Sequence, residues 1–259
     1  MKKYYQFFGL VLIMVFSFYY TEQIATIVLN KNPLMQMIKE EARNYNVSSV
    51  NALIDGNYIV PGLKGLEVNL RDSFYNMKES NVFSEYFLVF DEVKPEISLN
   101  DNKDKIIRQG NYKKKMVSLI LESEGEISEY LKSKNIKASL LSNLSNYVAN
   151  GYFEAINNEV SGFKSLENSL NLNKENKNIC ILNDNNKDIC LKNNKYLVDP
   201  GLKLNSSNII DVKNNILSGS IILIKNSAKL SDIMLILKEI NYKDLEIVFL
   251  SDLIKEDNN

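Results

Sequence analysis

Short apolar runs alternate with polar, helix-like segments through the second half of the chain. The runs MVSLIL (116–121) and SIILIK (220–225) have the length and composition of buried strands. Between such runs lie segments with apolar residues at helical spacing, of which LSDIMLILKEIN (230–241) is the clearest. Strands that alternate with helices of this length predict βαβ units, a mainly parallel sheet and right-handed crossovers.

About seven such units follow residue 115. A complete eight-unit barrel takes roughly 200 or more residues, and fewer than that remain here. The pattern therefore favours an α/β fold that forms an incomplete (β/α)7 barrel. Periodicity alone does not separate this arrangement from a doubly wound sheet.

The first half of the chain has a less regular pattern. It predicts a helix at 33–46, a hairpin at 47–61 that turns at 55–57, and a strand and a helix at 65–80. Residues 86–99 are expected to form another strand pair or one long strand broken at Pro95. The polar segment 101–115 marks a boundary. We therefore divide the chain into a cytoplasmic tip, signal anchor and connector at 1–32, a small α+β module at 33–112 and the barrel domain at 113–259.

The N-terminus has the pattern of a membrane signal. Lys2 and Lys3 precede an uncharged run from Tyr4 to Tyr20, which is at the short end of the roughly 17–25 residues of a membrane span. The two lysines favour a cytoplasmic N-terminus, so the rest of the chain is expected outside the cytosol. We expect a single-pass signal anchor in the cell membrane. A cleaved signal peptide is the alternative.

Composition narrows the function further. The chain has 259 residues, a formal net charge of −1 and no histidine. The balanced charge gives no basic field for nucleic acid, and the lack of imidazole excludes His-based triads and His-ligated zinc. Cys180 and Cys190, the two cysteines, predict a disulfide in an exported chain, with two free thiols as the alternative.

Two separated segments carry a resemblance to a known family. VSLILESEGEISEYLKSKNIKASLLSN (117–143) is similar to the opening of the polysaccharide deacetylase (NodB-homology) domain, a carbohydrate esterase family in which V-x-L-T-F-D-D precedes a helix and K-A-T-F-F. The segment 219–256 resembles that family's last units, which begin G-S-I-I-L-L-H and end V-x-L-S-E-L-L. The resemblance covers about residues 115–255 and implies the incomplete barrel of that family, here preceded by an anchor and a small module.

The same resemblance assigns the site residues. In active members, the first Asp of the pair is the general base, the second Asp and two histidines bind a divalent metal, and a late histidine assists as acid. Glu122 then occupies the base position and Lys225 the late-histidine position. The metal-ligand positions fall on Ser123, Asn158 and Gly162, and Asp199 lies in a groove segment that lacks the family's arginine. These groups do not rebuild an Asp–His–His site, so the resemblance implies lost deacetylation and no metal or other cofactor.

Purely structural roles also fit these residues. Ser123 with Glu126 three residues later matches a helix capping box. Lys225 is able to pair with Glu122 as an ion pair in place of the metal. A carboxylate that lines a groove for sugar is the functional interpretation of Glu122, and the sequence does not choose between the two.

The leading hypothesis is a membrane-anchored, extracytoplasmic deacetylase-like protein that is catalytically inactive and binds envelope polysaccharide or an envelope protein. One alternative keeps N-deacetylase or esterase activity through Glu122 and an atypical carboxylate metal site that draws on Asp199. Another is a structural envelope protein whose module at 33–112 makes the contacts. Nucleic acid is not an expected partner.

Overall fold

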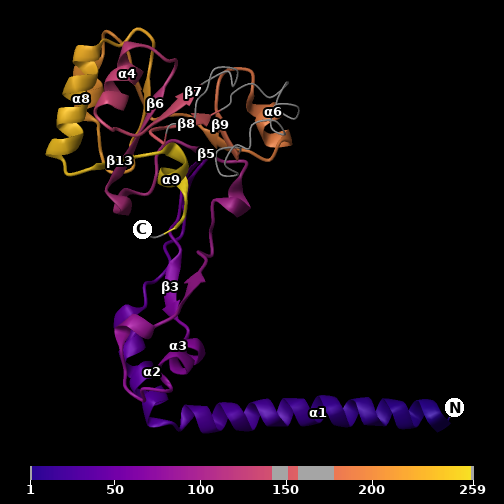
Figure 1. The fold of residues 1–259 in the computed structure, drawn as a ribbon. Helices are drawn as coiled ribbons and strands as arrows, with labels where there is room; N and C mark the ends of the chain where they lie inside the picture. The colour runs from indigo at the N-terminus through magenta and orange to yellow at the C-terminus, as the bar shows by residue number, and fades with distance from the viewer. Residues whose placement is uncertain (1, 142–150, 157–177, 258–259) are drawn as a thin grey trace. The chain divides into compact units, whose positions relative to one another are not determined.

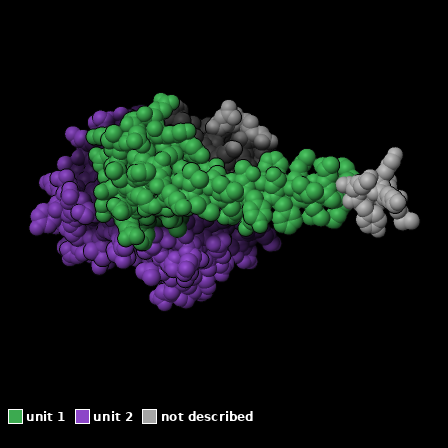
Figure 2. All heavy atoms as spheres, turned by 90° about the horizontal axis from the view of Figure 1, so that it is seen from below, with its two compact units in different colours: residues 1–48, 65–93 green, residues 49–64, 94–259 purple. Residues whose placement is uncertain are grey.

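The computed structural model describes residues 2–141, 151–156 and 178–257, and the chain folds as two compact units (Figure 2). Unit 1 contains residues 1–48 and 65–93, and unit 2 contains residues 49–64 and 94–259. The chain therefore leaves unit 1, enters unit 2 and returns before the barrel begins.

Unit 1 consists of helices and one small hairpin. Its elements are α1 (Lys2–Asn30), α2 (Pro33–Tyr45), β3 (Gly65–Val68), α3 (Leu70–Met77), the 3-10 turn η1 (Glu85–Phe87) and β4 (Phe90–Val93). The side chain of Asn32 caps α2 by accepting from the N–H of Leu34, and Pro33 occupies the first turn, where its missing donor costs nothing. The helix predicted at 33–46 is thereby confirmed.

The core of unit 1 lies between α2 and α3. Leu34, Met35 and Ile38 of α2 pack against Phe74 and Met77 of α3. These positions repeat at helical spacing on each element, so each helix buries one stripe and exposes the other. One residue of α1, Leu29, packs against the same cluster and ties the end of the long helix to it.

Unit 2 contains the strand–helix alternation that the sequence predicts. Its elements are β1 (Leu53–Asp55), β2 (Tyr58–Val60), η2 (Asn100–Asn102), β5 (Ile106–Ile107), η3 (Tyr112–Lys114), β6 (Met116–Leu121), α4 (Glu126–Ser133), β7 (Ala138–Leu141), β8 (Phe153–Ile156), β9 (Ile179–Ile181), α6 (Lys187–Lys192), β10 (Tyr196–Val198), β11 (Leu202–Leu204), α7 (Ile209–Asn214), β12 (Ile221–Ile224), α8 (Leu230–Tyr242), β13 (Glu246–Val248) and α9 (Leu250–Ile254). The helices predicted after β7 and β8 lie outside the described residues.

The strands form a mainly parallel arrangement (Figure 1). One sheet has the order β11-β12-β6-β7-β8, with β13 also paired to β6, and each of its strand pairs is parallel. The second sheet has the order β1-β2-β5-β10-β9, and β8 lies next to β9. In the part of the chain that the structure describes, the strands from β6 to β12 are divided between these two sheets, which meet at β8 and β9. The predicted α/β fold is confirmed.

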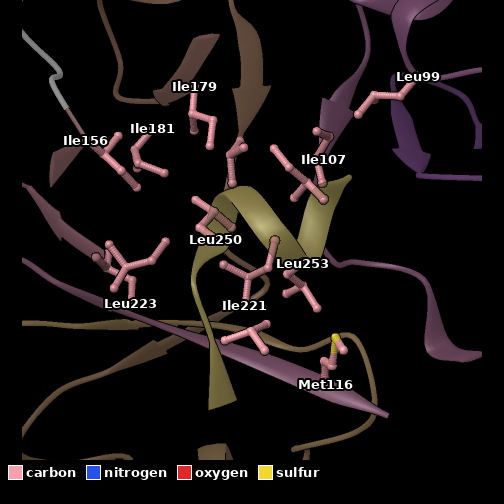
Figure 3. Packing of buried hydrophobic residues seen from close by; sticks show 14 of the residues in the cluster. Leu99, Ile107, Met116, Ile156, Ile179, Ile181, Ile221, Leu223, Leu250 and Leu253 are labelled. Atoms are coloured by element: carbon pink, nitrogen blue, oxygen red, sulfur yellow. The ribbon is translucent and has the colours of Figure 1, made fainter. Parts of the chain in front are cut away.

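Alternation along the strands separates two apolar cores. Val117, Leu119 and Leu121 of β6 belong to the cluster that includes α4 and α8, whereas Ile120 belongs to the other cluster. That second cluster contains Ile221 and residues of α9 such as Leu250 and Leu253, and Figure 3 shows α9 surrounded by these side chains. Since strand side chains alternate, every second residue of β6 and β12 faces the inner core.

Two short strands and one pairing were not predicted. β5 and β11 are two and three residues long, too short for an alternation pattern to appear. The predicted hairpin is present as β1–β2, but β2 pairs with β5 and so groups with unit 2. Residues 49–64 and 94–112 thus differ in grouping from the predicted module, and the division at 112 stays a prediction.

The expected disulfide is present. Cys180 of β9 and Cys190 of α6 are bonded, and both side chains are fully buried. They pack with Leu197 of β10, so the bond attaches α6 to the edge of the second sheet.

Candidate functional site

The polar cluster of interest lies where two neighbouring parallel strands end. Leu121 of β6 pairs with Ile224 of β12, and the N–H of Glu122 donates to the carbonyl of Ile224 at 3.1 Å. Continuing the register by one residue places Glu122 opposite Lys225. By strand alternation both follow inward-facing residues, namely Ile120 and Leu223, so they form the end layer of the inner face.

An ion pair joins the two side chains. Lys225 Nζ donates to Glu122 Oε1 at 2.8 Å, and the backbone N–H of Asn226 donates to Glu122 Oε2 at 2.9 Å. Burial acts to raise the pKa of Glu122, but the two hydrogen bonds and the positive charge of Lys225 outweigh it and lower that pKa. Glu122 is therefore an ionised carboxylate with both oxygens engaged. The ion pair suggested by the sequence is confirmed.

Ser123 is engaged by the same loop. Its hydroxyl donates to Asn226 Oδ1 at 2.6 Å, so the loops after β6 and β12 are joined by side chains at two successive positions. The predicted capping box on Ser123 is wrong, because α4 begins at Glu126 with Gly125 as its N-cap. There the N–H of Gly125 donates to the hydroxyl of Ser128 at 2.9 Å, which leaves no capping role for Ser123.

A cavity of about 380 Å³ opens beside this cluster. The first turns of α4 and α8 form its walls, and the polar groups that face it include Ser123, Glu124, Lys225, Asn226 and Lys229. This volume is within the range of small-molecule sites, roughly 300–1,000 Å³. Hydroxyl, amide, carboxylate and ammonium groups give this cavity both hydrogen-bond donors and hydrogen-bond acceptors.

Asp199 has other partners. It follows β10 and forms ion pairs with Lys203 Nζ at 2.8 Å and Arg108 Nη2 at 3.7 Å. The guanidinium of Arg108 in turn lies over the ring of Tyr58, 4.4 Å from its centroid. The structure thus brings Glu122, Ser123 and Lys225 together and gives Asp199 a separate set of contacts. Asn158 and Gly162 lie outside the described residues.

The sequence interpretation missed two residues. Asn226 contacts both Glu122 and Ser123, and its position directly after Lys225 was the available signal. Glu154 is a carboxylate in the middle of buried strand β8, only 3% exposed, and a charged residue inside an apolar strand was the signal there. Its partners lie in β7 and α9, so Glu154 faces the inner core.

Known proteins resemble this chain more in structure than in sequence. No protein-family model matches the chain. The uncharacterized protein YlxY of Bacillus subtilis (strain 168) is 35% identical over 97 residues, which is 37% of this chain and only 30% of that relative. The chain therefore matches less than a third of the length of this relative.

Solved structures match over a larger part of the chain. A CE4 family pseudoenzyme from Bacillus anthracis superposes with a TM-score of 0.54 at 18% identity, covering 87% of this chain and 96% of that one. A mutant of that pseudoenzyme with restored enzymatic activity gives a TM-score of 0.55 at 18% identity, covering 87% and 99%. The chain has the polysaccharide deacetylase fold. At 18% identity this similarity establishes the deacetylase fold alone. Whether the fold is active depends on the residues of the site.

The residues of this deacetylase fold do not suit the family's metal. Ser123 offers a neutral hydroxyl that already donates to Asn226, and the Glu122 carboxylate is bound to an ammonium group. Asn158 offers at most an amide oxygen, and Gly162 has no side chain. Among residues 2–141, 151–156 and 178–257, no group of three or more His, Cys, Asp or Glu side chains is placed to hold a metal ion. A site built on one Asp and two imidazoles does not fit this donor set.

Proposed function

We propose that this protein is a noncatalytic, membrane-anchored member of the deacetylase fold that binds cell-envelope polysaccharide at the ends of β6 and β12. The observation that carries the proposal is the Glu122–Lys225 ion pair. It sits at the carboxyl ends of barrel strands, which is where sites of barrel folds are built.

The chemistry of the pair argues against hydrolysis. A general base must accept a proton near the working pH, and a carboxylate with a lowered pKa and two hydrogen-bond donors is a weak base. Amide hydrolysis also needs an activated water, and the donor set offers no imidazole ligand to a Lewis acid. The ion pair therefore provides neither a general base nor an activated water. It does hold a polar surface in a fixed position.

Sugar binding needs only that surface. The cavity beside the pair presents Ser123, Asn226 and Lys229 on loops that the ion pair holds together. The Bacillus anthracis protein of the same fold is a pseudoenzyme, which supports a noncatalytic role for this chain.

The anchoring part of the proposal rests on α1. Residues Phe7–Asn30 form a helix long and apolar enough to cross a membrane. Lys2 and Lys3 precede it, so the orientation with an extracytoplasmic C-terminal part follows from the charge rule. Envelope glycan is then the carbohydrate that the exported part meets first.

The test combines an activity assay with a binding assay on the full chain in detergent. We expect no acetate release from N-acetylglucosamine oligomers with added zinc or cobalt, and retention of the same oligomers on an affinity column. Glu122→Gln with Lys225→Met should weaken retention several-fold, because both loops lose their link. The matched control is Glu239→Gln with Lys213→Met, which removes an ion pair between α7 and α8.

Two results would contradict the proposal. Acetate release that a chelator abolishes would restore the enzyme alternative. Equal retention of the site variant, the control variant and the unmodified chain would place any glycan contact elsewhere.

A further inference from the structure

A second cavity lies in unit 1, at the end of the long apolar helix. It has a volume of about 610 Å³ and is lined by the last two turns of α1, the start of α2 and one face of α3. All of these elements belong to the same compact unit, and Leu29 of α1 packs into the α2–α3 core. The cavity is thus a feature of this unit and is distant in sequence from the site on β6 and β12.

The cavity is at the level where a membrane helix meets the headgroups. The uncharged run from Tyr4 to Tyr20 extends about 26 Å at ~1.5 Å per residue, so it nearly fills the ~30 Å hydrocarbon layer before the turns of α1 that line the cavity begin. Its last turns therefore reach the interface. Tyr19 and Tyr20 form an edge-to-face pair before these turns, and such aromatic side chains are enriched at that level.

The lining of this cavity combines apolar and basic side chains. Val28 and Leu29 contribute the apolar part from α1. Three basic side chains, Lys39, Arg71 and Lys78, line it together with a single acid, Glu22. A surplus of positive charge beside an apolar wall is complementary to a phosphate group that carries acyl chains.

Local structure holds the basic groups in place. Lys39 Nζ donates to Asn30 Oδ1 at 2.8 Å, which fixes it beside the end of α1. Arg71 and Tyr75 of α3 and its C-cap residue Lys78, which keeps helical backbone angles, lie four and three residues apart and share one face. The Arg71 guanidinium lies 5.9 Å from the centroid of Tyr75. Leu70, Phe74 and Met77 occupy the neighbouring face and pack into the core of unit 1.

We propose that this cavity binds an anionic phospholipid of the leaflet that faces the exported part of the chain. Its phosphate lies among Lys39, Arg71 and Lys78, and an acyl chain runs along Val28 and Leu29. This inference rests on the membrane anchoring in the proposed function and is independent of glycan binding. The bound lipid fixes the depth at which unit 1 sits on the membrane.

The test uses the full chain in detergent micelles and three probes. Dioctanoyl phosphatidylglycerol carries the charge and the chains, dioctanoyl phosphatidylcholine carries chains without net charge, and glycerol 3-phosphate carries the charge without chains. We expect phosphatidylglycerol to bind at least tenfold more tightly than either other probe. The triple variant Lys39→Gln, Arg71→Gln, Lys78→Gln should lose tenfold or more of that affinity.

Two variants control for net charge and for folding. Arg43→Gln, Lys132→Gln, Lys238→Gln removes one arginine and two lysines from exposed positions outside the cavity and should bind like the unmodified chain. Lys39→Arg, Arg71→Lys, Lys78→Arg keeps the charge and should retain most of the affinity. Equal binding by both glutamine triples, or equal binding of the two lipids, would overturn the inference.

A flotation experiment distinguishes the absence of a lipid site from the absence of membrane anchoring. A chain that does not float with phosphatidylglycerol vesicles after an alkaline wash overturns the anchor and the lipid site together. A chain that floats but shows no lipid selectivity overturns the lipid site alone.

Discussion

Glu154 on β8 and Ser251 on α9 are joined by two hydrogen bonds across 97 residues of sequence. The hydroxyl of Ser251 donates to Glu154 Oε2 at 2.5 Å, and its backbone N–H donates to Oε1 at 3.2 Å. Ser139 of β7 donates to the same carboxylate and accepts from the N–H of Leu250. The first turn of α9 is thus held inside the barrel by a buried carboxylate, which satisfies donors that would otherwise be orphaned.

Glu154→Ala should be among the more destabilising single substitutions in the described part of unit 2. It leaves the two serine hydroxyls and the N–H of Ser251 without their acceptor, and each unsatisfied buried group costs about 1–3 kcal/mol. We expect the free energy of unfolding to fall by about 2–4 kcal/mol and Glu154→Gln to cost about half as much, measured by urea titration. Glu246→Gln, on the exposed side of β13, should change it by less than about 0.5 kcal/mol. A loss for Glu154→Ala no larger than that of the control would refute the role.

The same carboxylate should make stability depend on pH. Burial raises the pKa of Glu154 above the ordinary value of 4.5, and the hydrogen bonds from Ser139 and Ser251 only partly offset it. Below 4.5 both folded and unfolded states hold the proton. As pH rises from 4.5 to the raised pKa, only the unfolded state ionises, so stability falls across this window and then levels off.

Comparing the chain with Glu154→Gln isolates that contribution. Urea titrations at several pH values should show a smaller fall between pH 4.5 and 7 for the variant than for the unmodified chain. Parallel curves for the two proteins would mean that Glu154 ionises normally in the folded state.

Regular elements of the barrel were predictable because each satisfies a local rule. MVSLIL became β6 and SIILIK became β12, since continuous apolar runs of this length fit a strand buried on both faces. The parallel direction of the strands followed from the helices predicted between successive strands. The pairing of β2 with β5 was not predictable, because Tyr58 pairs with Ile106, far along the chain, and β5 has only two residues.

The site was predictable in part and for a different reason. Glu122 and Lys225 were singled out by family resemblance, and adjacent parallel strands then put them in register. The role of Asn226 depends on a backbone N–H and a loop conformation, which no residue pattern encodes. Glu154 was visible as a charge within FEAI, but its partner Ser251 is distant in sequence and nothing local points to it.

The Glu122–Lys225 pair should contribute little to stability, which a double-mutant cycle would measure. The side chains are 31% and 40% exposed, so solvent screens their attraction. For Glu122→Gln and Lys225→Met we expect a coupling of about 0.5–1 kcal/mol that shrinks in 1 M salt. Since the pKa of Glu122 is lowered, the coupling is present above 4.5 and is lost as pH falls through the lowered value. Coupling that persists at pH 2 would show that the contact is not ionic.

Gly219, just before β12, should not tolerate a side chain. Its φ is +88°, and a Cβ there would run into the carbonyl oxygen of Gly110. The backbone is unable to move aside, because Gly110 N–H donates to Gly219 and Gly219 N–H donates to Met116, both at 2.7 Å. Gly219→Ala should therefore lower the free energy of unfolding by about 3 kcal/mol or more, from the clash added to backbone strain.

Gly56, in the β1–β2 turn, provides the matched control for that substitution. Its φ is +55°, but no atom lies within 4 Å of the position that an alanine Cβ would occupy, so Gly56→Ala should cost only about 1 kcal/mol of backbone strain. Because β12 leads into Lys225, displacement of that strand in Gly219→Ala should also weaken glycan retention, whereas Gly56→Ala should leave it unchanged. Equal unfolding free energies for the two alanine variants would show that the contact between Gly219 and Gly110 does not hold the start of β12.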